Sequence, residues 1–335
     1  MPSKQEALNV IDQFRFTSGM PYFDPEVVTS IGRSILKVRY GLFIDRFLPY
    51  EIKISPKFKT ERDWSIGYFR DKAESFGLNL PDPFILYIDH TKAAAADGSI
   101  LALENKRISI PSAVQVGPLI IIAVRPKELN LSLAAKTHHE IGHYFSLTHY
   151  HVLNLPSPIN RIRSGATVET HEGVTRGTLF EEGYVRSETE DYINTRGKQK
   201  LPLDYLFLNA SLPQAVEQGE AARYLSTFTC YNISLFRRSF DFDVYHTDDF
   251  IDIHRELTAR IPNFIDILEQ ARATGKWNGL GRLIDNYYGP GVFRLLMSIN
   301  MENLGLSILK KSLQLVKKEV PGEELRGLII GERSL

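Results

Sequence analysis

The chain has 335 residues, of which 43% are hydrophobic and 24% charged, as is typical of a globular protein with one large or two modest domains. Its 40 basic and 40 acidic side chains give a formal net charge of zero without long basic clusters, so we expect no nucleic-acid partner. A single Cys excludes an internal disulfide framework, and no apolar run is long enough to cross a bilayer. Because no secretory h-region opens the sequence, we expect a cytoplasmic protein, with a specialised secretion route not excluded.

Residues 1–80 are predicted to be mainly helical, with one helix beginning at Pro25 and running through Lys37. Short strands follow, and their predicted ranges are 84–88, 100–103, 107–110 and 119–124. The last of them is apolar without alternation, which indicates a strand buried on both faces. An edge strand of such a sheet can bind an extended substrate through main-chain hydrogen bonds, although core packing explains this pattern equally well.

The helix predicted over Leu131–Leu147 contains the most informative motif, H-E-x-x-H at residues 139–143. His139 and His143 lie about 40° apart around a helix and one turn apart along it, so both imidazoles can point at one metal ion. Glu140 falls beside that metal, where it can take a proton from a bound water. The rest of the helix is largely apolar, and polar side chains buried without partners are costly, so a metal would supply the partner. His138 faces elsewhere and is expected to be a second-shell or surface residue.

A metal held by two His needs a third protein ligand, for which the sequence offers two candidates. Thr178 and Glu181 fit a capping box at the start of a helix, which would give Glu181 a structural role and leave Glu182 free to bind metal. Gly183 would then allow two helices to approach closely beside the site. His149 is the other candidate, but it faces away from His143 if the first helix simply continues.

The H-E-x-x-H helix and the later Glu181-Glu182-Gly183 resemble the zincin metallopeptidases, and most closely the gluzincins, in which a second helix carries a ligand Glu directly before a Gly. Residues 120–185 are also similar to the tubulin-tyrosine-carboxypeptidase kind of gluzincin, although the tubulin substrate does not transfer. The resemblance implies a zinc peptidase that acts on peptides or proteins. It implies Zn²⁺ held by His139, His143 and Glu182, with Glu140 as the general base.

Two alternatives stay open. His149 stands at the third-ligand spacing of the metzincins, but that family's Gly is Ser146 here, and no Met lies between Met20 and Met297 to form the family's Met-turn. The other alternative is a non-catalytic helical interaction protein with a structural or lost metal site.

The segment 154–177 is rich in Pro, Ser, Gly, Thr and Arg and is predicted to be a long loop. A loop that contains one short helix is the alternative. Arg161, Arg163 and Arg176 are close enough in sequence to suggest a site for a peptide carboxylate, although solvated loop charges are more common. After Phe180 the chain is predicted to be mostly helical, in segments 180–194, 213–238, 248–271, 278–287 and 291–318.

The sequence therefore predicts an α+β, zincin-like fold. A small mixed sheet and the active-site helix lie in the N-terminal half, the C-terminal half is mainly helical, and a cleft lies between the halves. The predicted regions are 1–80, mainly helical; 81–153, with the sheet and motif helix; and 154–335, the loop and the helices with the third ligand. Candidates for a second-shell carboxylate are Glu188, Glu190 and Asp191. Candidates for an oxyanion donor are Tyr231, His246, Tyr287 and Tyr288. The sequence does not predict the oligomeric state.

Overall fold

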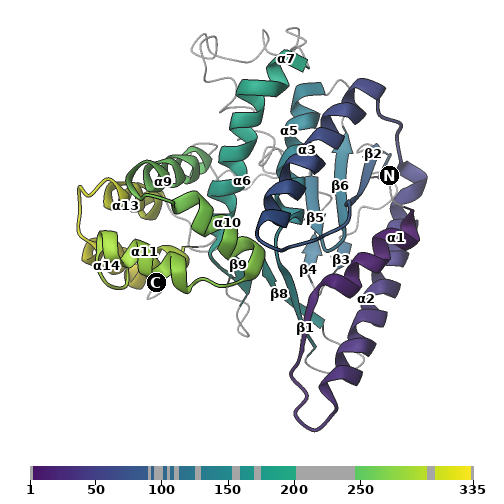
Figure 1. The fold of residues 1–335 in the computed structure, drawn as a ribbon, viewed down its shortest axis with the longest axis horizontal. Coiled ribbons are helices and arrows are strands. Elements are labelled where there is room, and N and C mark those ends of the chain that lie inside the picture. Colours follow the sequence, from purple (N-terminus) through teal and green to yellow (C-terminus); the bar gives the residue numbers. More distant parts are fainter. Residues whose placement is uncertain are drawn as a thin grey trace.

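The computed structural model describes residues 3–89, 92–93, 101–103, 106–108, 113–124, 130–152, 159–169, 175–200, 246–299 and 306–332. These residues form an α+β fold, as the sequence predicts (Figure 1). In Figure 1 the helices after residue 246 gather on the left of the view, and the N-terminal helices and the sheets occupy the right. None of the described helices combines the length and the apolar composition that crossing a membrane requires.

The N-terminal region is mainly helical. Its elements are α1 (Lys4–Asn9), β1 (Arg15–Ser18), α2 (Pro25–Phe47) and α3 (Pro56–Ser75). The side chains of Asp24 and Ser55 cap α2 and α3 by accepting main-chain hydrogen bonds. α2 begins at the predicted Pro25 but continues ten residues beyond the predicted end. The extra turns are stabilised because Phe43 and Phe47 are buried in the core.

All four predicted strands form, as β2 (Phe84–Asp89), β3 (Leu101–Leu103), β4 (Lys106–Ile108) and β6 (Leu119–Val124). A further strand, β5 (Ala113–Val116), was not predicted. It pairs with β6 through a turn at Gly117, whose φ of 56° favours glycine. The strand order is β2-β6-β5, with β2 parallel and β5 antiparallel to β6, whereas β3 and β4 form a separate hairpin. The apolar β6 is therefore the central strand, and β5 is an edge strand among the described residues.

The prediction of a long loop at 154–177 was wrong, because its described residues mostly form strands of a second sheet. The strands are β7 (Thr148–Val152), β8 (Ile159–Ser164), β9 (Thr167–Glu169) and β10 (Thr175–Arg176), in the order β1-β7-β8-β9-β10. Gly165, with a φ of 57°, makes the turn between β8 and β9, and the β-branched Thr167 and Val168 suit a strand. This sheet takes strands from all three predicted regions, and the division into regions stays a prediction.

The C-terminal part is helical, as predicted. Its helices are α6 (Thr178–Tyr192), α7 (Lys198–Lys200), α9 (His246–Arg260), α10 (Phe264–Thr274), α11 (Asn278–Tyr288), α12 (Val292–Met297), α13 (Leu306–Val316) and α14 (Gly322–Glu332). The predicted segments 248–271 and 291–318 are each two helices. Pro262 and Asn263, the latter with a φ of 60°, break the first of them. α14 was not predicted, and the predicted helix 213–238 lies outside the described residues.

His254 on α9 is buried against the rings of Tyr184 and Phe264. Burial, together with the positive charges of Arg255, Arg272 and Lys72, lowers its pKa from 6.5 to about 3. Above pH 6.5 the residue is neutral in both the folded and the unfolded chain. Between pH 6.5 and 3 only the unfolded chain takes up the proton, so this residue costs stability as the pH falls.

His254→Gln is therefore expected to lower the free energy of unfolding most at pH 8. The deficit relative to the wild type should shrink by roughly 1.4 kcal/mol per pH unit below pH 6.5. Urea denaturation of both proteins from pH 8 to pH 4 measures this difference. A deficit that is constant over the whole range would contradict the assignment of a buried, neutral imidazole.

Candidate metal centre

Helix α5 (Asn130–Tyr144) presents the motif to α6 from the core of the protein. Gly142 makes the close packing possible, because a Cβ there would lie 3.0 Å from Phe69 and 3.1 Å from Val185 on α6. Gly183 was predicted to serve this contact, and that prediction was wrong. A Cβ on Gly183 would instead lie 3.0 Å from the carbonyl oxygen of Phe250, so Gly183 allows α9 to approach α6.

The side chains of His139, His143 and Glu182 converge between α5 and α6. The two Nε2 atoms are 3.0 Å apart, and the Glu182 carboxylate oxygens lie 3.8 Å from Nε2 of His139 and 3.6 Å from Nε2 of His143. Within the described residues this is the one group of His, Cys, Asp or Glu side chains with three potential ligand atoms within 4.8 Å of one another. The group predicted from the sequence is thus assembled, and it could hold a metal ion.

The spacing of these donor atoms can be compared with that of a metal site. Zinc with imidazole and carboxylate ligands at about 2.0–2.1 Å in tetrahedral geometry places its donor atoms about 3.3 Å apart. The two Nε2 atoms are 3.0 Å apart, and the two oxygens of Glu182 lie 3.6 Å from His143 and 3.8 Å from His139, so each of these separations is within about 0.5 Å of that value. Two imidazoles and a carboxylate are also an established ligand set for a catalytic zinc. The residues therefore fit a divalent metal.

Glu181 orients His143. Its Oε1 is 3.0 Å from Nδ1 of His143, so the imidazole donates from Nδ1 and Nε2 is the ring nitrogen that faces the group. The predicted capping box of Thr178 and Glu181 does not form. Gly177, with a φ of 78°, is the N-cap of α6, so Thr178 is already inside the helix and Glu181 is released to face α5. The carboxylate behind the motif histidine is therefore Glu181, and the prediction of Glu188, Glu190 or Asp191 for this role was wrong.

Arg272 on α10 holds Glu181 in place. Its Nε and one terminal nitrogen donate to the two carboxylate oxygens at 2.9 and 2.8 Å, and the terminal nitrogen also donates to the carbonyl of Gly142 at 2.8 Å. The main-chain N–H of Ala166 adds a bond of 2.8 Å to Glu181. Burial alone would raise the pKa of Glu181, but the charge and hydrogen bonds of Arg272, helped by His143, lower it to about 2. Glu181 is therefore a fixed anion behind His143.

Arg186 holds the carboxylate of Glu182, the third candidate ligand, in place. One helical turn after Glu182, its Nε donates to the Glu182 carboxylate at 3.1 Å. The guanidinium is buried and lies 5.1 Å from the centre of the Phe250 ring. The Glu182 side chain is 23% exposed, more than those of the two histidines, so the group is open on the Glu182 side.

Glu140 is buried next to β5 of the sheet. Burial, with the negative charge of Glu182, raises the pKa of Glu140 to about 7, whereas His143 and a hydrogen bond from the main-chain N–H of Gln115 act in the opposite direction. A carboxyl group with such a pKa can both accept and release a proton near neutral pH. The role of Glu140 as a general base stays a prediction.

Two other histidines near the motif lie outside the group. His138 is buried, its Nδ1 is 2.9 Å from the hydroxyl of Ser65, and its ring stacks on Tyr192 at 4.5 Å. It is therefore a core residue and not a surface one. His149 lies on β7, where its Nε2 is 3.1 Å from the hydroxyl of Thr17.

The predicted second-shell carboxylates pair with other side chains. Glu188 binds Lys72, and Glu190 and Asp191 both pair with Arg255. None of these contacts includes a motif histidine, which leaves Glu181 as the carboxylate that the structure places behind the group.

The predicted arginine cluster is not a shared site among the described side chains. Arg163 lies on β8 with its guanidinium 5.8 Å from the centre of the Trp277 ring, and Arg176 is exposed on β10. The side chain of Arg161 lies outside the described residues. A carboxylate site formed by these residues stays a prediction.

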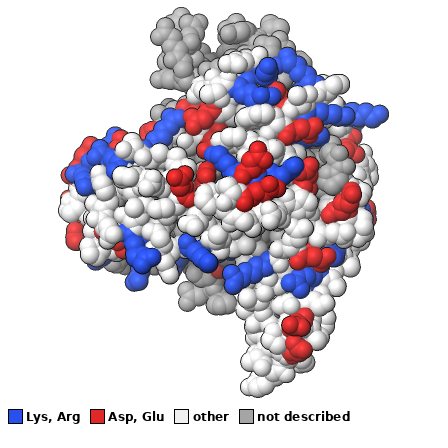
Figure 2. All heavy atoms as spheres, viewed as in Figure 1, with Lys and Arg blue, Asp and Glu red and all other residues white. Residues whose placement is uncertain are grey.

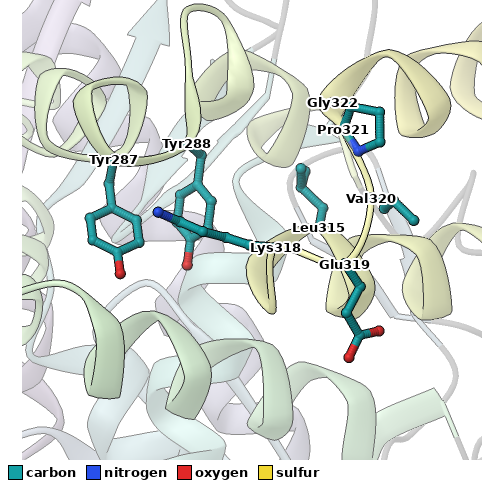
Figure 3. Close-up of a pocket in the computed structure, with 8 residues that line it drawn as sticks. All are labelled: Tyr287, Tyr288, Leu315, Lys318, Glu319, Val320, Pro321 and Gly322. Atoms are coloured by element: carbon teal, nitrogen blue, oxygen red, sulfur yellow. The ribbon is translucent and has the colours of Figure 1, made fainter.

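Two of the predicted oxyanion donors, Tyr287 and Tyr288, line a separate pocket of about 390 Å³ together with Lys318 (Figure 3). The Tyr288 hydroxyl donates to the carbonyl of Val316 at 2.8 Å. This pocket shares no lining residue with the His/Glu group, so the structure offers no support for either tyrosine as an oxyanion donor. Tyr231 and the side chain of His246 lie outside the described residues.

Comparison with known proteins adds no assignment to this geometry: no protein-family model matches the chain, and no curated protein or solved structure is significantly similar to it.

Proposed function

We propose that this protein is a zinc-dependent metallopeptidase with a zincin-like arrangement. The observation that carries the proposal is the convergence of His139, His143 and Glu182 from two packed helices, with Glu140 one residue from the first ligand. The donor set and spacing suit zinc. The small mixed sheet beside α5 and the helical C-terminal part agree with the zincin resemblance. In this arrangement the substrate would bind in a cleft between the N-terminal half, which contains the sheet, and the helical C-terminal half.

Each residue of the proposed site has a separate chemical role. His139, His143 and Glu182 would hold the metal, which when bound makes a water acidic and polarises a carbonyl group. Glu140 accepts a proton on its carboxylate and releases it to the leaving amine, which its pKa of about 7 permits. Glu181 and Arg272 keep His143 in the tautomer that presents Nε2, and Arg186 steadies the Glu182 carboxylate.

A peptide is the substrate class that the surroundings favour. β5 packs against α5 and is an edge strand among the described strands. An extended peptide could add to such an edge through main-chain hydrogen bonds, which bring its carbonyl groups alongside the motif helix.

Zinc stoichiometry separates Glu182 from His149 as the third ligand. We expect Glu182→Gln to lower zinc affinity by about 10-fold or more, because a neutral amide is a much poorer ligand than a carboxylate. His149→Asn should leave zinc binding unchanged, since that imidazole is bonded to Thr17. Mass spectrometry of metal content after dialysis against a series of zinc buffers measures both.

The opposite pattern, with zinc lost only in His149→Asn, would replace the proposal by the metzincin-like alternative. Zinc that is bound tightly in a protein cleaving no member of a peptide library would instead favour the non-catalytic alternative with a structural site. Both variants should be checked for unchanged thermal unfolding in the absence of zinc.

A further inference from the structure

The exposed large hydrophobic side chains of the described residues all lie on α2 and the turns at its two ends. They are Tyr22, Phe23, Val27, Ile31, Val38, Leu42 and Leu48. Tyr22 is 94% exposed and Leu42 is 67% exposed. Single exposed apolar residues are ordinary, but seven gathered on one helix and its flanking turns mark an interaction surface.

Four of these residues form a stripe along the outer side of the helix. Val27, Ile31, Val38 and Leu42 fall within an arc of about 60° around an α-helix. The opposite side of α2 is in the core, where Gly32 lies against Val152. Figure 1 shows α2 along the edge of the molecule, with the turn before it projecting at the bottom of the view, and this projection is mostly white in Figure 2.

The stripe is self-complementary. Its pattern is symmetric about a point between Ser34 and the next residue, because Ile31 and Val38 are equally far from that point, as are Val27 and Leu42. A two-fold axis through this point would place Ile31 against Val38 of a second copy and Val27 against Leu42 of that copy. Self-complementary patches of this kind are what a two-fold dimer interface requires.

The charges at the two ends of α2 select the antiparallel arrangement. Asp24 and Glu26 begin the helix, and Arg46 lies at its other end, where the neighbouring Asp45 is already paired with Lys4 at 2.6 Å. The two-fold axis places Asp45 of one copy opposite Asp24 of the other, but Lys4 and Arg46 make this end of α2 net positive, whereas a parallel pair would set the two acidic ends together. The acidic residues beside Tyr22 also disfavour an anionic membrane as the occupant. We propose that the outer face of α2 is the interface of an antiparallel homodimer.

The mass of the full-length protein in solution tests this proposal. We expect sedimentation equilibrium to give a concentration-dependent dimer, and Val38→Glu to raise its dissociation constant at least about tenfold, since the charge enters the interface in both copies. Thr60→Glu, which places the same charge on an exposed position of α3, is the matched control and should leave the dimer unchanged. Val38 is an exposed residue, so the thermal unfolding of the variant should match that of the wild type.

Cross-linking tests the register of the interface. With Cys230→Ser as the background, Ser34→Cys should form a disulfide-linked dimer under mild oxidation, because the two Ser34 residues would lie beside the two-fold axis. Ser75→Cys, an exposed serine on α3, should cross-link far less. A monomeric wild-type protein, whether or not it binds lipid vesicles, would overturn the proposal. So would a dimer that Val38→Glu leaves intact, or equal cross-linking at the two positions.

Discussion

Glu140→Gln is expected to leave zinc bound and to reduce peptide hydrolysis by about 10²–10⁴-fold. The carboxylate is not one of the three converging ligands, so the amide should leave the metal site intact. It cannot accept the proton from water or return one to the leaving amine, and the loss should therefore fall on kcat more than on KM. Cleavage of a synthetic peptide library, read by mass spectrometry, followed by kinetics on the best peptide, measures the effect.

Glu74→Gln is the matched control for this change, because it makes the same substitution at an exposed position of α3. It should retain both zinc and activity. Full activity in Glu140→Gln would contradict the proposed mechanism. A loss of zinc together with activity would show that Glu140 supports the metal and would remove the evidence for a general base.

Arg272→Met is expected to lower the free energy of unfolding by about 3–5 kcal/mol, because it leaves the carboxylate of Glu181 buried without its ion-pair partner. Glu181 should then bind a proton more readily, and His143 should be held less firmly. Zinc affinity is therefore expected to fall about 10–100-fold, as is usual when the group behind a metal-binding imidazole is disturbed. Chemical denaturation without zinc and a zinc titration measure the two effects separately.

The variant with both Arg272→Met and Glu181→Leu tests whether the unpaired charge of Glu181 causes the loss of stability. Removing both charges should recover a large part of the lost stability, because the cost lies in the unpaired charge, but it should not recover zinc affinity. Arg260→Met, which breaks a surface ion pair with Glu256, is the control and should change stability little. Equal stability of Arg272→Met and the wild type would contradict the described network.

The parts of the site that follow from local periodicity were predictable. His139 and His143 are four residues apart on one helix, and a helix alone brings them together, whatever the rest of the fold does. The same holds for the apolar β6 and for the helical nature of the C-terminal part. The position of Glu182 could not be predicted from local periodicity, because it depends on the packing of α6 against α5. The resemblance to the gluzincins was the basis for expecting it there.

The missed features depend on contacts between distant parts of the chain. Arg272 lies 91 residues after Glu181, and nothing in the local sequence relates the two. The predicted capping box at Thr178 failed because Gly177 starts α6 in a left-handed conformation, which shifts Glu181 to the inner side. A Gly directly before a predicted helix was the available signal. Likewise, the strands at 159–176 are stabilised by a sheet whose first strand, β1, lies near the N-terminus.

X-ray absorption at the zinc edge, measured on the purified full-length protein, tests the metal centre most directly, since it identifies the atoms around the metal. We predict a shell of two imidazoles and oxygen donors at about 2.0–2.1 Å, without sulfur. Glu182→Gln should alter the oxygen component and leave the two imidazoles. A shell with three imidazoles, a sulfur ligand, or a protein that binds no zinc would contradict a site built from His139, His143 and Glu182.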